Sequence, residues 1–146
     1  MEEKKYERLT LSNQLCFPLY AAAKEIVRKY KPYLDEIDLT YTQYITMMLM
    51  WEHKQMNVRQ LGECLYLDSG TLTPVLKKLQ EKGFVTRRRS EKDERETIVT
   101  VTDEGMALRD KAVGIPEAMG KCVALTPDEA QLLYKLLYRI LGDEKG

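Results

Sequence analysis

The sequence predicts a mainly α-helical protein with one small β-hairpin. Apolar residues recur at helical spacing along most of the 146 residues, and helix-start signals precede several of these stretches. Two runs rich in Val, Ile and Thr, "GFVTRRR" and "ETIVTVT", flank the charged segment "SEKDER", which is typical of two strands joined by a turn. The length fits one domain with its own core, so we expect a single domain over residues 1–146.

The first expected helix covers residues 11–31. Leu15 and Leu19 lie on one apolar stripe of this helix, and Cys16 and Tyr20 lie on a second. A helix with two apolar stripes is expected to contact both its own domain and another surface. Its proline, in "CFPLY", cannot donate a backbone hydrogen bond, so it begins the regular helix or kinks it. We expect the next segment, "KYKPYLDEID", to be a connection broken by its proline.

A helix-turn-helix followed by a two-stranded ribbon is expected over residues 39–102. Thr40 and Gln43 form a capping-box pattern before the apolar helix "YITMMLMWEH". Asn57 and Asp68 are N-cap candidates for two short helices, "VRQLGECLYL" and "SGTLTPVLKKLQEK". Two short helices joined by a tight polar turn and followed by a β-hairpin make a winged helix-turn-helix.

The remaining helices are expected within residues 103–141. Thr126, Pro127 and Glu129 form a strong helix start, with an N-cap, a proline in the first turn and a capping box. The helix that follows repeats Leu and Ile along one face. It comes last in a small domain whose core the earlier elements already supply, so this face is available for another contact. We therefore expect residues 103–141 and 11–31 to act as dimerisation helices at the two ends of the chain.

The net charge is zero, but it is unevenly distributed. Residues 77–95 carry eight Lys and Arg against four Asp and Glu, a net charge of +4, between segments of net charge −1 and −3. This pattern indicates an anionic partner, and a solvated charged surface is the alternative explanation.

Several classes of protein and site are excluded by what the sequence lacks. No apolar run approaches the roughly 18 residues that a membrane span needs, and the N-terminus lacks a secretory signal. We therefore expect a cytoplasmic protein with no membrane partner. The cysteines, Cys16, Cys64 and Cys122, are widely spaced and there is one histidine, so we expect no metal and no cofactor.

The helix that begins after Asp68 has the features of a helix that reads the major groove of double-stranded DNA. B-DNA admits one α-helix there, and the residues near its N-terminus reach the base edges. Small and hydroxyl residues occupy this end, and their other use is helix capping. Because no arginine is present there to pair with guanine, we expect DNA shape to supply part of the specificity. The candidate contacts are Ser69, Gly70, Thr71 and Thr73.

The hairpin supplies the remaining candidate DNA contacts. Arg95 at its tip is the candidate for insertion into the minor groove, because narrow A·T grooves attract arginine. Asp93 can orient the Arg95 guanidinium through a hydrogen bond. Side chains alternate along a strand, so the three consecutive arginines cannot all face the duplex. The candidate phosphate contacts are Lys77, Lys78, Arg87, Arg88 and Arg89.

These segments resemble a known family. "LDSGTLTPVLKKLQEKGFVTR" followed by "KDERETIVTVTDEG" is similar to the MarR family of winged helix-turn-helix repressors. "NQLCFPLYA", "KYKP", "LTYTQY" and "WEH" narrow the resemblance to the organic hydroperoxide resistance regulators. The likeness spans about residues 11 to 115, and the last 30 residues match only in general character. Pro18 departs from the motif, where a small or aliphatic residue is more usual.

The resemblance implies a cytoplasmic homodimer that binds a pseudo-palindromic operator and regulates transcription under oxidative stress. It further implies that an organic hydroperoxide oxidises Cys16, the redox-sensing thiol, and that the dimer then releases the DNA. Tyr30 and Tyr41 would hydrogen-bond the sulfur, and Tyr20 would approach it from the other subunit. In relatives with a second cysteine, that cysteine closes an intersubunit disulfide, and in others a low-molecular-weight thiol reacts instead. Cys122 is the candidate for such a resolving thiol.

Physical reasoning adds two expectations about the cysteines. An apolar pocket beside Cys16 would favour alkyl or lipid peroxides over hydrogen peroxide, and its expected members are Leu15, Phe17, Met47, Met48 and Trp51. Cys64 is expected to be a buried packing residue.

Two other functions remain open at the level of sequence. One is a repressor of the same fold that is induced by a non-covalent phenolic or lipophilic ligand. The other is a thiol peroxidase, but the sequence shows no dedicated resolving motif or acid–base residue beside Cys16. We therefore expect a regulator and not an enzyme.

Overall fold

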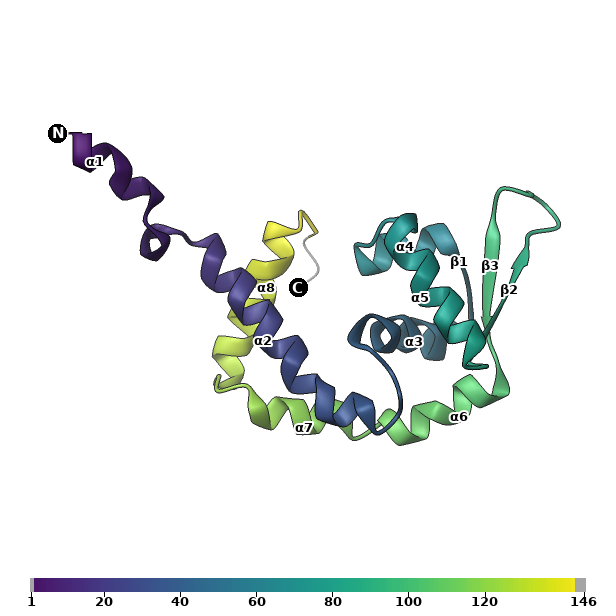
Figure 1. Ribbon diagram of the computed structural model, residues 1–146. Coiled ribbons are helices and arrows are strands. Elements are labelled where there is room, and N and C mark those ends of the chain that lie inside the picture. Colours follow the sequence, from purple (N-terminus) through teal and green to yellow (C-terminus); the bar gives the residue numbers. More distant parts are fainter. Residues whose placement is uncertain (1, 144–146) are drawn as a thin grey trace. The chain divides into compact units, whose positions relative to one another are not determined.

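The computed structural model describes residues 2–143, and Figure 1 shows their course. The chain divides into two compact units, Met1–Ile115 and Pro116–Gly146. A single domain was expected over residues 1–146, and the first residue and last three residues of this range lie outside the described part. The expected segment 39–102 falls within the first unit. No helix in the described part of the chain is long and apolar enough to cross a bilayer.

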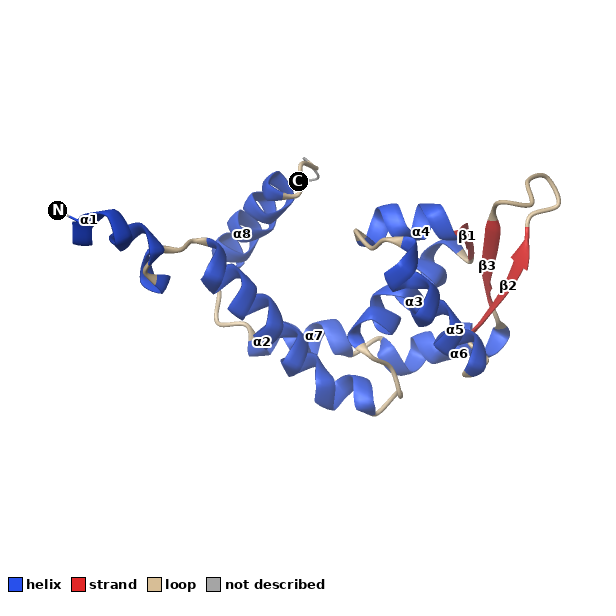
Figure 2. Ribbon diagram, turned by 45° about the horizontal axis from the view of Figure 1, so that its top comes forward, coloured by secondary structure: helices blue, strands red, loops and turns tan. Residues whose placement is uncertain are grey.

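The first unit contains the expected winged helix-turn-helix, and its strands form a three-stranded antiparallel sheet (Figure 2). The mainly helical fold class with a small β-hairpin is confirmed. Besides the two strands of the expected hairpin, the sheet contains a short strand, β1 (Gln55–Asn57). It pairs with β3 (Thr97–Val101), and Met56 lies opposite Val99. At three residues, β1 is too short to show the alternation that predicts strands. The elements are α3 (Tyr41–His53), β1 (Gln55–Asn57), α4 (Val58–Leu65), α5 (Ser69–Glu81), β2 (Val85–Arg89), β3 (Thr97–Val101) and α6 (Asp103–Ala112).

Side-chain caps fix the starts of these helices. Thr40 and Gln43 form the expected capping box at the start of α3. Asn57 caps α4, and Asp68 caps α5 by accepting from the backbone N–H of Thr71 at 2.7 Å. Because each cap satisfies backbone donors that the helix leaves unpaired, these helices begin where the sequence indicates.

The core of the first unit is formed by the helices and strands of the winged helix-turn-helix. Its fully buried side chains come from α3, α4, α5, β2 and β3, and each buried Leu or Met contributes about 2 kcal/mol. Gly105 of α6 packs so closely on the hairpin base that a Cβ atom would lie 2.2 Å from the Phe84 carbonyl oxygen. Trp51 donates to the Gly105 carbonyl at 2.8 Å and ties α3 to α6. The core side chains include Met47, Met50, Leu61, Leu72, Leu76, Leu79, Val85 and Val99.

The long helix α2 (Cys16–Asp35) corrects one expectation. Pro32 lies inside the helix, so the expected break at "KYKP" is wrong. A proline in the last turn removes a single backbone bond, and Leu34 beyond it is 2% exposed, so its packing keeps the turn helical. Pro18 lies in the first turn, where its missing N–H costs no helical bond. Before α2 lie α1 (Glu2–Tyr6) and two 3₁₀ turns, Glu7–Leu9 and Leu11–Asn13.

Two further helices follow α6, and they are α7 (Ile115–Cys122) and α8 (Pro127–Ile140). The expected capping box of Thr126 and Glu129 is present at the start of α8. No residue of α8 is buried in the single chain. Four of its apolar side chains, Leu132, Leu133, Leu136 and Ile140, are 40% to 65% exposed.

Candidate functional site

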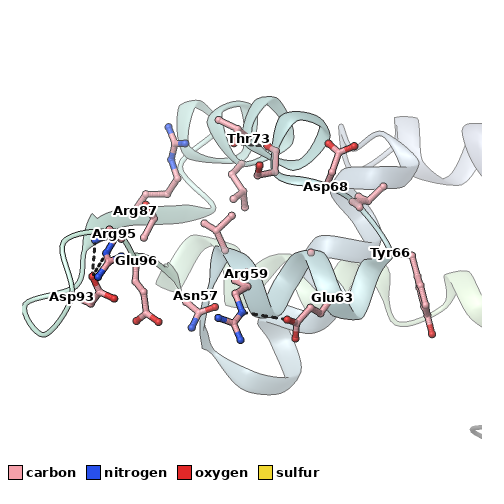
Figure 3. A pocket seen from close by; sticks show the side chains of 16 residues that line it. Asn57, Arg59, Glu63, Tyr66, Asp68, Thr73, Arg87, Asp93, Arg95 and Glu96 are labelled. Atoms are coloured by element: carbon pink, nitrogen blue, oxygen red, sulfur yellow. Dashed lines mark hydrogen bonds and ion pairs between the residues drawn. The ribbon is translucent and has the colours of Figure 1, made fainter. Parts of the chain in front are cut away.

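A polar groove of about 1190 Å³ lies between α4, the start of α5 and the hairpin of β2 and β3 (Figure 3). We call this hairpin, residues 85–101, the wing, and α5 the recognition helix. The groove brings together several of the expected DNA contacts, which are Ser69, Thr73, Arg87, Asp93 and Arg95. These residues are distant in sequence, and they meet because the wing folds back beside the recognition helix.

At the wing tip, Asp93 holds Arg95. The Asp93 Oδ1 atom accepts a hydrogen bond from the Arg95 backbone N–H at 3.0 Å and lies 3.5 Å from Arg95 Nε. Figure 3 shows the two side chains in contact beside the groove. The Arg95 side chain is 94% exposed. The guanidinium is therefore directed by a carboxylate while it remains accessible to a ligand.

The three consecutive arginines of β2 have different surroundings. Arg87 donates from Nε to Gln80 Oε1 of the recognition helix at 2.7 Å, and it lines the groove. Arg89 donates to the Glu94 carbonyl at 2.7 Å and braces the turn of the wing. Arg88 is exposed and does not line the groove. The alternation expected along a strand therefore separates Arg87 from Arg88.

The start of the recognition helix combines capping with exposure. Asp68 accepts from the Thr71 backbone N–H, and this hydrogen bond lowers the pKa of the Asp68 carboxyl. Thr73 donates its hydroxyl to the Ser69 carbonyl at 2.7 Å. Gly70 is exposed, and a Cβ atom there would lie 3.3 Å from the Asp68 carboxylate. Lys77 and Lys78 lie exposed further along the helix, and Lys78 pairs with Glu81 at 3.5 Å.

The groove also contains residues that the sequence analysis missed. Arg59 lies in the first turn of α4 and pairs with Glu63 one turn later, with Nε and Oε1 3.3 Å apart (Figure 3). The i, i+4 spacing of opposite charges was a visible signal, but it does not say which way the pair faces. Tyr66 lines the groove from the turn between α4 and α5, with φ of +57°. Asn57 and Glu96 also line the groove.

Cys16 is the first residue of α2, and it is exposed in the single chain. Tyr20 lies one turn further along the helix, on the same face, and is 60% exposed. The Lys24 ammonium lies 5.1 Å from the centre of the Tyr20 ring, again one turn on. One face of α2 thus presents a thiol, a phenol and a cation in consecutive turns.

Tyr30 and Tyr41 lie together in an aromatic cluster. Their ring centroids are 4.9 Å apart, and Tyr44 lies 5.7 Å from Tyr30. Trp51 extends the cluster, with its ring 6.3 Å from that of Tyr44. Burial raises the pKa of all three tyrosines, and a neighbouring phenol raises each further. The phenols therefore keep their protons at neutral pH and can donate hydrogen bonds.

The tyrosine cluster is remote from Cys16 of the same chain. Fourteen residues of continuous helix separate Cys16 from Tyr30, which corresponds to about 21 Å. Within residues 2–143, no side chain hydrogen-bonds to the sulfur of Cys16 in the single chain. A contact between Cys16 and Tyr30 or Tyr41 would therefore have to join two subunits.

The expected apolar pocket is not assembled within one chain. Met47 is fully buried in the core, whereas Leu15 is 84% exposed. Phe17 and Met48 are also exposed, and Trp51 is occupied with Gly105. Only the exposed members, Leu15, Phe17 and Met48, are accessible to a second chain that could cover them.

The other two cysteines differ from each other. Cys64 is exposed, so the expectation of a buried packing residue is wrong, because it lies on the outer face of the short helix α4. Cys122 is partly buried and donates to the Ala118 carbonyl at 3.4 Å. No three His, Cys, Asp or Glu side chains of residues 2–143 form a group that could hold a metal ion.

Comparisons with known proteins agree with this architecture. Residues 28–112 match the family model described as transcriptional regulator SarA/Rot. The organic hydroperoxide resistance transcriptional regulator of Bacillus subtilis is 44% identical over 139 residues, 95% of either chain. The HTH-type transcriptional regulator SarZ of Staphylococcus aureus is 50% identical over 103 residues, 70% of either chain.

A solved relative, AbfR of Staphylococcus epidermidis, is similar over nearly the whole chain. Overoxidized AbfR bound to DNA is 35% identical, with a TM-score of 0.76 over 94% of this chain and 97% of that one. Reduced AbfR bound to DNA gives a TM-score of 0.77 at 32% identity, and disulfide-formed AbfR gives 0.62 at 33% identity. The match with reduced AbfR covers 96% of this chain and 97% of the AbfR chain, and the match with disulfide-formed AbfR covers 97% of each chain. The chain therefore belongs to the SarA/Rot family of MarR-type winged-helix transcriptional regulators, and within it to the organic hydroperoxide resistance type.

Proposed function

We propose that this protein is a homodimeric transcriptional repressor that binds an operator through the groove and releases it when an organic hydroperoxide oxidises Cys16. The observation that carries the proposal is the exposed thiol at the start of α2, in a chain 44% identical to an organic hydroperoxide resistance regulator. The reduced, overoxidized and disulfide-formed structures of AbfR support redox chemistry over binding of a non-covalent inducer. The curated relatives are transcriptional regulators, which supports a regulator and not an enzyme.

The chemistry at Cys16 is a two-electron oxidation. The thiolate attacks the outer oxygen of a hydroperoxide, an S–O bond forms as the O–O bond breaks, and the alkoxide leaves and takes up a proton. The peroxide is reduced to an alcohol, and the sulfur becomes a sulfenic acid. Phenol donors beside the sulfur stabilise the thiolate that starts this reaction.

The tyrosines that serve Cys16 come from two chains. Tyr20 belongs to the same chain, because it lies one turn along the same helix. Tyr30 and Tyr41 belong to the partner subunit, because about 21 Å of helix separates Tyr30 from Cys16 within a chain. This assignment reverses the one implied by the family resemblance, in which Tyr20 came from the partner.

Dimerisation also accounts for the uncovered apolar faces. Leu15, which precedes α2, and Leu19 within it are 84% and 39% exposed, and α8 has no buried residue. A second copy covers such faces in a symmetric dimer. In the dimer, the two recognition helices must lie about 34–36 Å apart to enter successive major grooves of a pseudo-palindromic operator. A repressor of this kind acts in the cytoplasm, where its DNA lies.

Oxidised Cys16 has three chemical fates that differ in mass. It remains a sulfenic acid, forms a mixed disulfide with a low-molecular-weight thiol, or forms an intersubunit disulfide with Cys122 as the resolving thiol. The disulfide form of AbfR supports the third fate for a relative of this chain. Non-reducing mass spectrometry of peroxide-treated protein distinguishes the three products.

The proposed function is tested by following oxidation and DNA release in one sample. Reduced protein on labelled operator is titrated with cumene hydroperoxide, and the oxidised fraction of Cys16 is measured beside the bound fraction of DNA. The proposal expects the two curves to track each other. Complete conversion of Cys16 to a sulfenic acid or a disulfide, verified by mass, with the operator still bound would overturn it.

A mixed dimer tests the cross-subunit assignment. One chain carries Cys16→Ser, and the other carries Tyr30→Phe and Tyr41→Phe. The single remaining Cys16 then faces intact tyrosines only if they come from the partner. We expect this mixed dimer to oxidise at the wild-type rate and the Tyr30→Phe, Tyr41→Phe homodimer to oxidise more slowly. Slow oxidation of the mixed dimer would instead place the tyrosines in the same chain.

A further inference from the structure

We propose that Lys82 is a positioning residue that couples the tyrosine cluster to the recognition helix, so that a change at Cys16 reaches the DNA-binding surface. The inference rests on the proposed function. Lys82 is the residue directly after α5, and its backbone N–H caps that helix by donating to carbonyls of the last turn. Any shift of its side chain is therefore transmitted to the end of the recognition helix.

The Lys82 ammonium is held by groups near the start of α3. It donates to the backbone carbonyl of Asp38, and to Gln43 Oε1 at 3.0 Å. It also lies 3.6 Å from the Asp38 carboxylate. The ammonium therefore has two hydrogen-bond acceptors and one ion-pair partner, 39 to 44 residues away in sequence. The Lys82 side chain is only 24% exposed, which is low for lysine.

Both partners of Lys82 adjoin the tyrosine cluster. Gln43 is 6% exposed, belongs to the capping box of α3, and lies two residues after Tyr41. Asp38 lies in the turn between α2, which carries Tyr30, and α3, which carries Tyr41. Its φ is +53°, a left-handed conformation that is costly for a residue other than glycine. A turn of this kind has few alternative conformations and does not absorb a movement of Tyr41. The movement therefore displaces Asp38 and Gln43, which hold Lys82.

The other end of α3 is fixed separately. Trp51 donates to the Gly105 carbonyl, and Gly105 packs directly on the base of the wing. A displacement that begins at Tyr41 is therefore expressed at the start of α3, where Lys82 is attached. Oxidation of Cys16 removes the thiolate that the partner's phenols face, and Lys82 then transmits the resulting shift to the recognition helix.

The structure allows Lys82 to be replaced without leaving a buried charge. Asp38 is 88% exposed in its side chain and stays solvated, and Gln43 Oε1 still accepts from the Thr40 N–H at 3.1 Å. Lys82 does not line the protein groove between α4, the recognition helix and the wing, so its replacement removes no side chain from that groove. The variant Lys82→Met keeps the length of the aliphatic chain and removes the ammonium. Lys82→Arg restores a cation, and the exposed Lys111→Met on α6 is the matched control.

The test measures operator affinity of each variant twice, with Cys16 reduced and with Cys16 oxidised as verified by mass. For Lys82→Met we expect the reduced affinity to stay near the wild-type value. The loss of affinity on oxidation should shrink by about fivefold or more, the usual lower range of coupling between sites. Lys82→Arg and Lys111→Met should behave as the wild type. Equal loss of affinity in Lys82→Met and wild type would overturn the role of Lys82.

The controls separate this inference from the proposed function. If the wild type keeps its operator after Cys16 is oxidised, the proposed function fails. If the wild type releases DNA and Lys82→Met releases it equally, only the coupling role fails. Circular dichroism checks that Lys82→Met is folded. If Lys82→Met does not fold, Lys82→Gln, which keeps a polar donor on a shorter chain, is measured instead, and its loss of affinity on oxidation is judged in the same way.

Discussion

The rings of Tyr30 and Tyr41 lie 4.9 Å apart, although one tyrosine belongs to α2 and the other to α3. The turn between the two helices brings the phenols together, and burial keeps them protonated. About 21 Å of helix separates the pair from Cys16 of the same chain. A sensor built from this thiol and these phenols therefore works only as a dimer, and this requirement joins redox sensing to subunit arrangement.

Removal of one phenol hydroxyl should slow the oxidation of Cys16. Tyr41→Phe keeps the ring in the cluster and removes the proposed hydrogen bond to the thiolate, and such bonds to charged groups contribute about 1.5 kcal/mol or more. We expect the second-order rate constant with cumene hydroperoxide to fall about tenfold. Stopped-flow or quenched mass spectrometry measures this rate.

Tyr44→Phe is the matched control for Tyr41→Phe. Tyr44 shares the cluster and is 3% exposed, but it is not among the phenols assigned to the thiol. Its oxidation rate should stay near the wild-type value. An equal decrease in both variants would mean that packing of the cluster, and not donation by Tyr41, controls the reaction.

The tyrosine cluster should make stability depend on alkaline pH. Burial raises the pKa of Tyr30, Tyr41 and Tyr44 above that of tyrosine in the unfolded chain. Their contribution is therefore complete below about pH 10 and is lost as the pH rises through the raised values of the folded protein. The unfolding temperature should fall between pH 9 and about pH 11, and the triple Phe variant should lose part of this fall. A triple variant with an unchanged pH profile would contradict the assignment.

Arg95→Ala should weaken operator binding by about 1–3 kcal/mol, because it removes the side chain that we propose enters the minor groove. Asp93→Asn should have a smaller effect, since it loosens the guanidinium without removing it. Arg109→Ala, an exposed arginine of α6 outside the groove, is the control. Fluorescence anisotropy with labelled operator measures all three. Wild-type affinity in Arg95→Ala would remove the wing tip from the interface.

Lys77→Ala should weaken binding to all DNA sequences similarly. A lysine that contacts a phosphate releases about one counterion, so the slope of log affinity against log salt should flatten by about one unit. The exposed Lys111→Ala should leave the slope unchanged. A sequence-dependent loss in Lys77→Ala would instead indicate a base contact.

Local features of the fold were predictable from the sequence. The caps at Thr40, Asn57, Asp68 and Thr126 were identified because each depends on residues three positions apart. The pairing of Asp93 with Arg95 was also predictable, since the two residues lie only two positions apart along the chain.

Features that depend on distant contacts were not predictable. The short strand β1 exists because β3, more than 40 residues later, supplies its partner. Arg59 reaches the groove because of the way α4 packs, and Pro32 remains helical because Leu34 is buried. The separation of Cys16 from Tyr30 became evident only when α2 proved to be continuous through "KYKP". In each case tertiary packing, and not local preference, decides the outcome.

The central claim is tested most directly by operator release from Cys16→Ser. Replacement of the Cys16 sulfur by oxygen does not change any residue of the protein groove, so reduced wild type and the variant should bind operator equally well. After cumene hydroperoxide at a dose that frees the wild type, the variant should remain bound. Release of the Cys16→Ser protein at that same dose would show that the first thiol of α2 is not the sensor.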